Sequence, residues 1–372
     1  MGKPKRAWLA TRKAINHALL LGLHRPNQSN NRIKQPLWSQ VWQMDRQLSS
    51  ILGVPYSVPY SQSRHCIDES IPAQIMHRIN NVVCHIGDRN QGIGQHSIPE
   101  IETQIQECAT LFPEEWFSLS TEGLSFEFIY ARQVCLMYLM QLKKNLYLPD
   151  VLTALQNPEA SQTHREHAVQ ACREMVSAYK VLRNSSKSAL VICDLMDFIV
   201  FSAALVLALH LLAPPGSRNS SRDADDWAII THLTLTFRQL SRAIECSVAK
   251  QAATLLEYLY AAHHHQYAGP EEYVAVIPWF GRVKISCVPR QQHIAYLQTP
   301  STDDNAESVG SCIEFGVNLL TPTTGSGNEL ESWSIQHMEE ELGIDWTAFD
   351  DADWEYDWHQ IFYSTNHYES TD

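Results

Sequence analysis

The chain has 372 residues, 44% of them hydrophobic, so it is long and apolar enough to bury one large core or two ordinary ones. Its formal net charge is −13, and its nine cysteines are scattered without a CxxC pair. That pattern argues against a disulfide framework and a cysteine-rich zinc site, and it fits a reducing intracellular compartment.

The charge is unevenly distributed along the chain. The first 46 residues contain nine Lys and Arg against Asp45 alone, whereas residues 291–372 contain 17 Asp and Glu and no Lys or Arg. Such a shift predicts a C-terminal segment with physical behaviour of its own. We therefore divide the chain into a body, residues 1–290, and a tail, residues 291–372.

Two helices are predicted at the start of the body. The first has an apolar stripe and ends at Gly22. The second begins near Leu37 and ends at Gly53 and Pro55. The first stripe contains Trp8, Ala14, Ile15, Ala18, Leu19 and Leu21; the second helix has Leu37, Val41, Met44, Leu48 and Leu52 on the expected buried face and Gln40, Gln43, Gln47 and Ser50 on the wet side.

Helical periodicity continues through the rest of the body, so we expect an all-α, multi-helix domain. A 25-residue run, 189–213, is strongly apolar, but Asp194 and Asp197 interrupt it and leave only 16 clean residues. A membrane span needs about 20, so this run predicts a core helix and no membrane contact. The further helices are predicted over residues 71–86, 100–108, 126–146, 166–182, 190–212 and 227–262, and residues 274–288 predict either a short hairpin or an extended strap.

The tail combines two kinds of sequence. Polar, weakly periodic stretches predict a disordered linker, and residues 346–363 then alternate seven aromatic residues with carboxylates. This alternation is typical of a disordered activation segment whose aromatic residues fold onto a partner's basic-rimmed apolar groove. The alternative is a solvated terminal helix that caps the body. The residues expected to act are Trp346, Phe349, Asp350, Asp351, Asp353, Trp354, Trp358 and Phe362.

No motif predicts catalysis, a metal site or a cofactor. His164 and His167 are three residues apart but lack the HExxH order of zinc proteases, so they predict a solvated surface. Residues 263–265 are three histidines that suit the C-terminal end of a helix. No zinc finger, basic-region helix or helix-turn-helix is recognisable, so contact with DNA is expected only indirectly.

The two predicted N-terminal helices together resemble the fungal-specific transcription factor regulatory domain, the middle homology region of binuclear zinc-cluster regulators of the xylanolytic-activator type. The resemblance is strong over residues 7–59 and weaker to about residue 290, where the segment 276–281, VIPWFG, is similar to a late motif of the family. It rests on two linked motifs that agree in order and spacing: Ala7-Trp8, Ala14, Ala18, Leu21 to Arg25, Leu37-Trp38, Trp42, Asp45-Arg46, Ser49, Gly53 and Pro55.

The residues of these motifs predict packing and not chemistry. Gly22 lets the first helix end, and His24 and Arg25 are placed to meet its terminal carbonyls. Trp38 and Trp42 lie one turn apart and anchor the second helix, while Arg46 stacks on Trp42 and Asp45 pairs with a basic group. Gly53 and Pro55 end that helix.

The resemblance implies a nuclear transcription regulator that recruits the transcription machinery or a coactivator through its tail and has a possible homo- or heterodimer partner. The sequence departs from the family in two ways: Val54 replaces an arginine, and no zinc cluster precedes the first helix. Zinc and direct DNA binding are therefore expected only from a missing module or a partner. Two alternatives are a helical enzyme of secondary metabolism and a non-functional truncated fragment.

Overall fold

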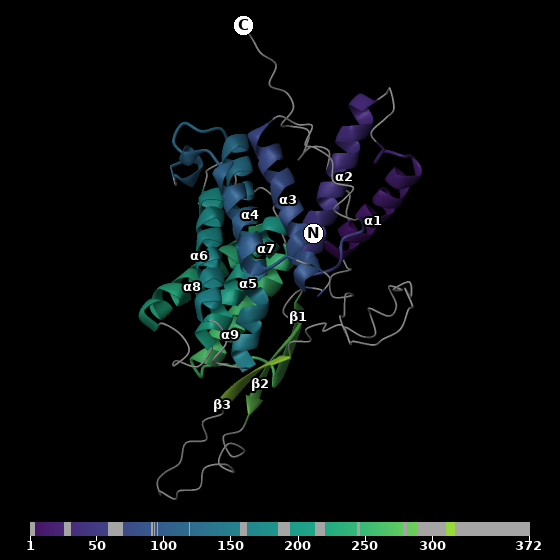
Figure 1. The fold of residues 1–372 in the computed structure, drawn as a ribbon. Coiled ribbons are helices and arrows are strands. Elements are labelled where there is room, and N and C mark those ends of the chain that lie inside the picture. The colour runs from purple at the N-terminus through teal and green to yellow at the C-terminus, as the bar shows by residue number, and fades with distance from the viewer. Residues whose placement is uncertain are drawn as a thin grey trace, which may run out of the picture.

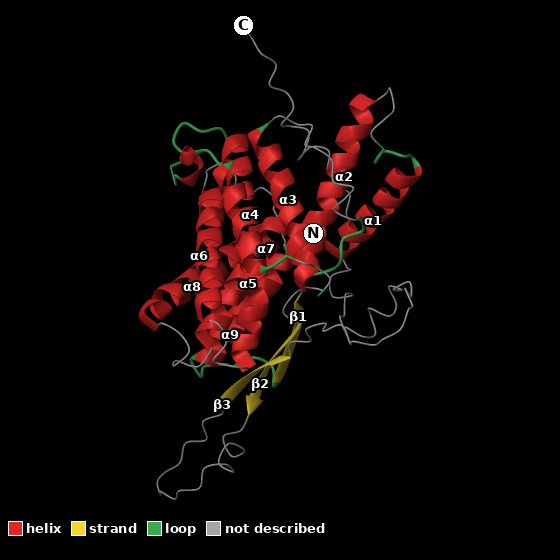
Figure 2. Cartoon of the chain, in the orientation of Figure 1, coloured by secondary structure: helices red, strands yellow, loops and turns green. Residues whose placement is uncertain are grey.

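The computed structural model describes residues 4–25, 31–58, 70–90, 92, 94, 96–118, 120–156, 162–184, 194–212, 220–243, 246–277, 281–288 and 310–316. This described part is mostly helical, as predicted, with a small sheet at one end of the helical body (Figures 1 and 2). Its elements are α1 (Pro4–Leu20), α2 (Asn31–Leu52), α3 (Ile71–Asn90), α4 (Ile98–Thr110), the 3-10 turn η2 (Glu114–Phe117), α5 (Phe126–Gln156), α6 (Gln162–Asn184), α7 (Asp194–Leu212), the 3-10 turn η4 (Ser220–Arg222), α8 (Asp223–Ala243), α9 (Ser247–His263), β1 (Glu272–Ile277), β2 (Gly281–Val288) and β3 (Gly310–Gly316).

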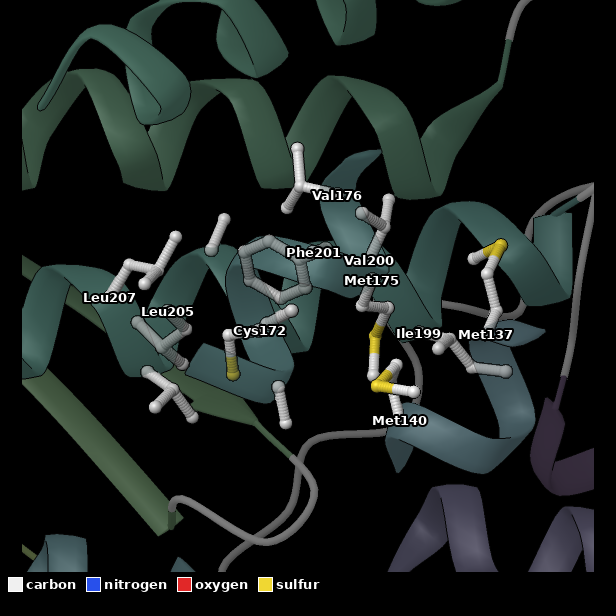
Figure 3. Packing of buried hydrophobic residues seen from close by; sticks show 14 of the residues in the cluster. Met137, Met140, Cys172, Met175, Val176, Ile199, Val200, Phe201, Leu205 and Leu207 are labelled. Atoms are coloured by element: carbon white, nitrogen blue, oxygen red, sulfur yellow. The ribbon is translucent and has the colours of Figure 1, made fainter. Parts of the chain in front are cut away.

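Helix α7 lies in the centre of the body, where α5, α6, α8 and α9 pack around it. Its window Leu195–Leu212 is long and apolar enough for a membrane span, but 83% of it is buried inside the protein, which confirms the predicted core helix. Figure 3 shows Ile199 of α7 beside Met140 of α5 and Met175 of α6, and Leu205 of α7 near Cys172 of α6. The five cysteines whose side chains are described are buried. Burial raises the pKa of Cys135 and Cys172 to about 12, so these two thiols stay protonated.

Helix α5 continues ten residues beyond its predicted end, through Pro149. Proline has no backbone N–H and leaves the carbonyl four residues earlier without its helical partner. That carbonyl belongs to Asn145, and it accepts a hydrogen bond from Asn90 Nδ2 of α3 at 3.5 Å. The side chain from α3 compensates for the missing bond, so the helix runs on.

Two helices replace the single one predicted over residues 227–262. Helix α9 begins at a separate N-cap, Cys246, whose sulfur accepts from the Ala249 amide at 3.4 Å. A bidentate pair ties α8 to α6, because Arg173 Nε and a terminal guanidinium nitrogen each lie 2.7 Å from an Asp226 carboxylate oxygen. The break lets α8 and α9 fold back against each other and cover α7.

The predicted hairpin is present and belongs to a larger sheet. Strands β1 and β2 pair antiparallel, and β3 joins the other edge of β2 with Ile285 opposite Ile313. Val283 and Ile285 are fully buried in the main core, so the sheet closes the end of the body near α9. β3 was not predicted and lies beyond the boundary at 290/291. That boundary, and the activation-tail residues from Trp346 to Phe362, lie outside the described residues.

Candidate functional site

Helices α1 and α2 end in the same backbone motif. The amides of Gly22 and Leu23 donate to the carbonyls of Leu19 and Ala18, and Gly22 has φ +67°. The Val54 amide likewise donates to the Ser49 carbonyl, and Gly53 has φ +69°. This is the Schellman motif, which uses a left-handed glycine to satisfy terminal carbonyls. The predicted role of both glycines is confirmed.

We expect Gly22→Ala to lower the free energy of unfolding by about 1–2 kcal/mol, because an L side chain is strained at this positive φ. The matched control is Gly87→Ala inside α3, where the new Cβ would only touch the Tyr56 ring at 3.7 Å. The control is expected to be neutral or to stabilise by up to about 1 kcal/mol. Urea unfolding followed by circular dichroism measures both, and equal effects would contradict the assignment of Gly22.

Arg46 lies at the centre of a buried cluster between α2 and α3. Its side chain is fully buried and donates to Asp45 Oδ2 at 2.6 Å, to the Val58 carbonyl, and to Cys84 Sγ at 3.2 Å. The guanidinium also lies over two rings, 4.6 Å from the centroid of Trp42 and 4.4 Å from that of Tyr56. The predicted stacking of Arg46 on Trp42 and the predicted pairing of Asp45 are both present.

Asp45 connects this cluster to the segment that follows α2. Its carboxylate accepts from the Ser57 amide at 2.8 Å and from the Ser57 hydroxyl at 2.7 Å. The Pro55 carbonyl accepts from Arg12 of α1 and from Ser49 Oγ. Residues 54–58 are thereby fastened to both helices, and we call Asp45, Arg46, Trp42, Tyr56 and Ser57 the Arg46 cluster.

Burial sets the protonation of the groups around the Arg46 cluster. It raises the pKa of the Cys84 thiol to about 11, against the opposing effect of Arg46. The pKa of Tyr56 is also raised, first by burial and then by the hydrogen bond that its hydroxyl donates to Asp88. These groups therefore stay neutral near pH 7, and the cluster holds a paired charge among neutral donors.

The other predicted motif residues lie around this cluster, with one exception. Trp8 is buried with Arg12 stacked 4.4 Å from its ring centroid, and the His24 ring lies 5.9 Å from that of the buried Trp38. Arg25 is exposed, and its backbone amide donates to the Gly22 carbonyl. Val54, which follows Gly53, packs with Trp8, Leu48 and Leu52.

The predicted buried face of α2 is wrong in part. Leu37 is 44% exposed, whereas Ser50, predicted to be wet, is buried and accepts from Asn145 Nδ2 at 3.2 Å. Leu21, predicted on the stripe of the first helix, follows the end of α1 and is exposed as well. The buried face of α2 is centred on the tryptophans and the Asp45–Arg46 pair, because these large side chains fill the space toward α1 and α3.

Among the described residues, the predicted histidines included, no three His, Cys, Asp or Glu side chains come together in a way that could hold a metal ion. His164 contacts Asp150 Oδ2 through Nδ1 at 2.6 Å and packs on the Tyr147 ring together with the exposed His167. His263 ends α9 as predicted, and its ring packs 4.9 Å from that of Trp227. These rings link neighbouring helices at the surface.

A buried lysine, which was not among the predicted site residues, lies deeper in the body. The Lys144 side chain on α5 is fully buried and donates to Ser202 Oγ of α7 at 2.5 Å. Burial lowers its pKa to about 8, with Cys172 acting in the opposite direction. On the other side of α7, Asp197 accepts from Tyr179 and pairs with Arg183. Lys144 and Asp197 each occur within an apolar stretch of sequence, and such a stretch predicts a buried core but no particular polar contact.

Comparison with known proteins gives the class. No family model matches the chain, and no solved structure does. The chain is 25% identical to the dehydrocurvularin biosynthesis regulator of Aspergillus terreus over 360 residues, which cover 83% of this chain and 49% of that protein. It is also 25% identical to the regulator of the same description from Alternaria cinerariae over 70% of this chain and 37% of that protein, and 26% identical to transcription factor eupR of a Phoma species over 31% and 29%.

The chain is a distant homologue of fungal transcription regulators. The similarity covers most of the chain, and the relatives are regulators and not enzymes. The chain spans about half the length of the first relative and less of the second. The groups of the Arg46 cluster are paired, buried and stacked, and together they position helices.

Proposed function

We propose that this chain is part of a fungal transcription regulator of the binuclear zinc-cluster type. Residues 1–290 serve as its regulatory body, and residues 291–372 serve as an acidic activation tail. The proposal rests above all on the similarity to regulators over 83% of the chain. The paired motifs of residues 7–59 support the binuclear zinc-cluster type. The alternation of acidic and aromatic residues over 346–363 supports the activation role.

Under this proposal the protein acts in the nucleus, and its contact with DNA comes from a zinc cluster outside these 372 residues or from a partner. Two relatives are described as biosynthesis regulators, so we extend the proposal to a set of biosynthetic genes as targets. RNA sequencing after deletion of the gene tests this. Loss of transcripts from one group of biosynthetic genes is expected, and an unchanged transcriptome would reject it.

The activation role is tested by fusing residues 291–372 to an unrelated DNA-binding domain upstream of a reporter gene. The fusion is expected to activate, because carboxylates keep the aromatic side chains solvated and available to a coactivator. Changing Trp346, Phe349, Trp354 and Trp358 to Ala should abolish most of the signal.

The matched control is Trp333→Ala, an aromatic residue of the same tail outside the acid-aromatic stretch, which should leave the signal unchanged. Immunoblotting confirms equal amounts of each fusion. A tail that does not activate, or that activates equally without its four aromatic residues, would reject the activation role while leaving the similarity to regulators intact.

A further inference from the structure

An apolar patch bordered by carboxylates lies on the connection between α4 and α5. Four large apolar side chains are exposed there: Leu111 at 43%, Phe117 at 52%, Leu124 at 38% and Phe128 at 38%. The exposed carboxylates interleaved with them along the chain are Glu114, Glu115, Glu122 and Glu127. We call these eight residues the acidic patch. No Lys or Arg occurs between Arg89 and Arg132, so no basic side chain of this segment offsets the charge.

A layer of buried rings supports the acidic patch. Phe112 and Trp116 are buried beneath it and lie edge to face, with their ring centroids 5.8 Å apart. The exposed ring of Phe117 packs on Phe112, and the exposed ring of Phe128 packs on Trp116. The two exposed aromatic rings therefore belong to one continuous set of ring contacts.

Hydrogen bonds fix the loop that carries Glu122 and Leu124. The buried guanidinium of Arg132 donates twice to the Ser120 carbonyl, with both nitrogens 3.3 Å away. The Leu124 amide donates to the Thr121 carbonyl at 3.3 Å. A surface that is already ordered loses little conformational entropy when a partner binds, so the acidic patch is suited to docking.

The charge of the acidic patch limits what can bind there. Nucleic acids and anionic lipid surfaces are negatively charged, so the glutamates repel both. Residues 291–372 are repelled in the same way, because they contain 17 Asp and Glu and no Lys or Arg. The basic helix α1 of the same molecule lies on the opposite side of the helical body and cannot reach the patch (Figures 1 and 2). These exclusions leave a protein segment that is both apolar and basic.

Large apolar side chains that are exposed together mark an interaction site, and aromatic ones contribute most to binding energy. Every described residue of the connection lies in a helix, a 3-10 turn or a loop, so the patch offers an extended peptide no strand edge with which to pair. A helix pairs its own backbone and binds through its side chains alone.

We propose that the acidic patch docks a basic amphipathic helix of another protein. The apolar face of that helix packs on Phe117, Leu124 and Phe128, and its Lys and Arg side chains pair with the surrounding glutamates. This inference does not depend on the proposed function, because it rests on the surface of residues 111–128 alone.

A synthetic peptide tests the proposal on the full chain. The peptide contains only leucine and lysine, is about 18 residues long, and has its leucines three and four residues apart so that they form one face of a helix. Isothermal titration calorimetry is expected to find one peptide bound per chain. A peptide of the same composition in scrambled order lacks an apolar face and should bind at least about tenfold more weakly. Equal binding of both peptides would show that charge alone attracts them and would overturn the proposal.

Two variants of the full chain locate the peptide. In the first, Glu114, Glu115 and Glu122 are changed to Lys; in the second, Phe117 and Leu124 are changed to Ala. Each variant should bind the helical peptide at least about tenfold more weakly. A peptide with glutamate in place of every lysine should bind the first variant and not the unchanged chain, which shows that the variant still folds and presents the surface.

Matched controls lie outside the acidic patch. One control changes the exposed Glu174, Asp225 and Glu271 to Lys, and the other changes Leu235 of α8, which is 58% exposed, to Ala. Both should bind the helical peptide as the unchanged chain does, and circular dichroism checks that every variant folds. The proposal fails if the helical peptide does not bind, if either patch variant keeps full affinity, or if the controls lose affinity equally.

Cross-linking in the native cell identifies the source of the helix. A photo-reactive amino acid replaces Leu124 in the full chain, or Leu235 as the control position, and mass spectrometry sequences the linked peptides. At Leu124 these should come from a basic amphipathic segment of another protein. Links to a second copy of this chain, links to an acidic segment, or the same links at both positions would overturn the proposal.

Discussion

Replacing Arg46 with alanine is expected to lower the free energy of unfolding by about 3–5 kcal/mol. The change leaves the Asp45 carboxylate buried without its countercharge and removes the guanidinium from between the Trp42 and Tyr56 rings. Urea unfolding followed by far-ultraviolet circular dichroism measures the loss. An additional Asp45→Asn change should recover part of it, because the orphaned charge is then gone while Ser57 keeps an acceptor.

Arg78→Ala is the matched control for Arg46→Ala. Arg78 also pairs with a carboxylate, Glu107, but the two side chains are 40% and 54% exposed. An exposed pair contributes about 0–1 kcal/mol because water solvates either charge after the other is removed. Similar losses for Arg46→Ala and Arg78→Ala would contradict the central role of the Arg46 cluster.

Lys144→Met is expected to stabilise the protein, with a pronounced dependence on pH. In the folded chain the pKa of Lys144 is lowered from 10.5 to about 8, a displacement equivalent to roughly 3 kcal/mol. Below pH 8 the lysine is protonated in both states, so the cost of its buried charge is fully present and methionine relieves it. Between pH 8 and 10.5 only the unfolded state keeps the proton, and the advantage of methionine fades.

Paired urea titrations of the unchanged chain and Lys144→Met at pH 7, 8, 9 and 10 measure this dependence. Ionisation of other groups is common to both proteins and cancels in the difference. The exposed Lys250→Met on α9 should shift stability by less than about 0.5 kcal/mol at every pH. A Lys144→Met difference that stays constant across the series would show that the charge of Lys144 is not its source.

The sequence was sufficient to predict the helical class and the ends of α1 and α2. Both ends rest on glycines that local backbone physics requires, and the stacking of Arg46 on Trp42 follows from their four-residue spacing. Helix α7 could be recognised as buried because its sequence is strongly apolar and too short for a membrane span. Hydrophobic periodicity predicts these helices well, because it marks the residues that a helix buries.

Features that depend on contacts between distant segments escaped prediction. Leu37 fits the apolar repeat of α2 but faces outward, since Trp38 and Trp42 occupy the buried side. The helix predicted to end at residue 146 runs on through Pro149, where the distant Asn90 donates to the Asn145 carbonyl. Strand β3 comes from a polar region, and its pairing with β2 has no local signal. The Ser57 contacts of Asp45 likewise follow from tertiary structure.

The position of α7 affects how the chain folds while it is being translated. This helix leaves the ribosome before α8 and α9, the two later helices that cover it. About 50 residues separate the end of α7 from the end of α9, so translation takes roughly 3–10 s to supply its cover. During that interval a strongly apolar helix has only earlier segments to shield it. Nascent chains stalled before α9 should therefore recruit chaperones that bind apolar segments.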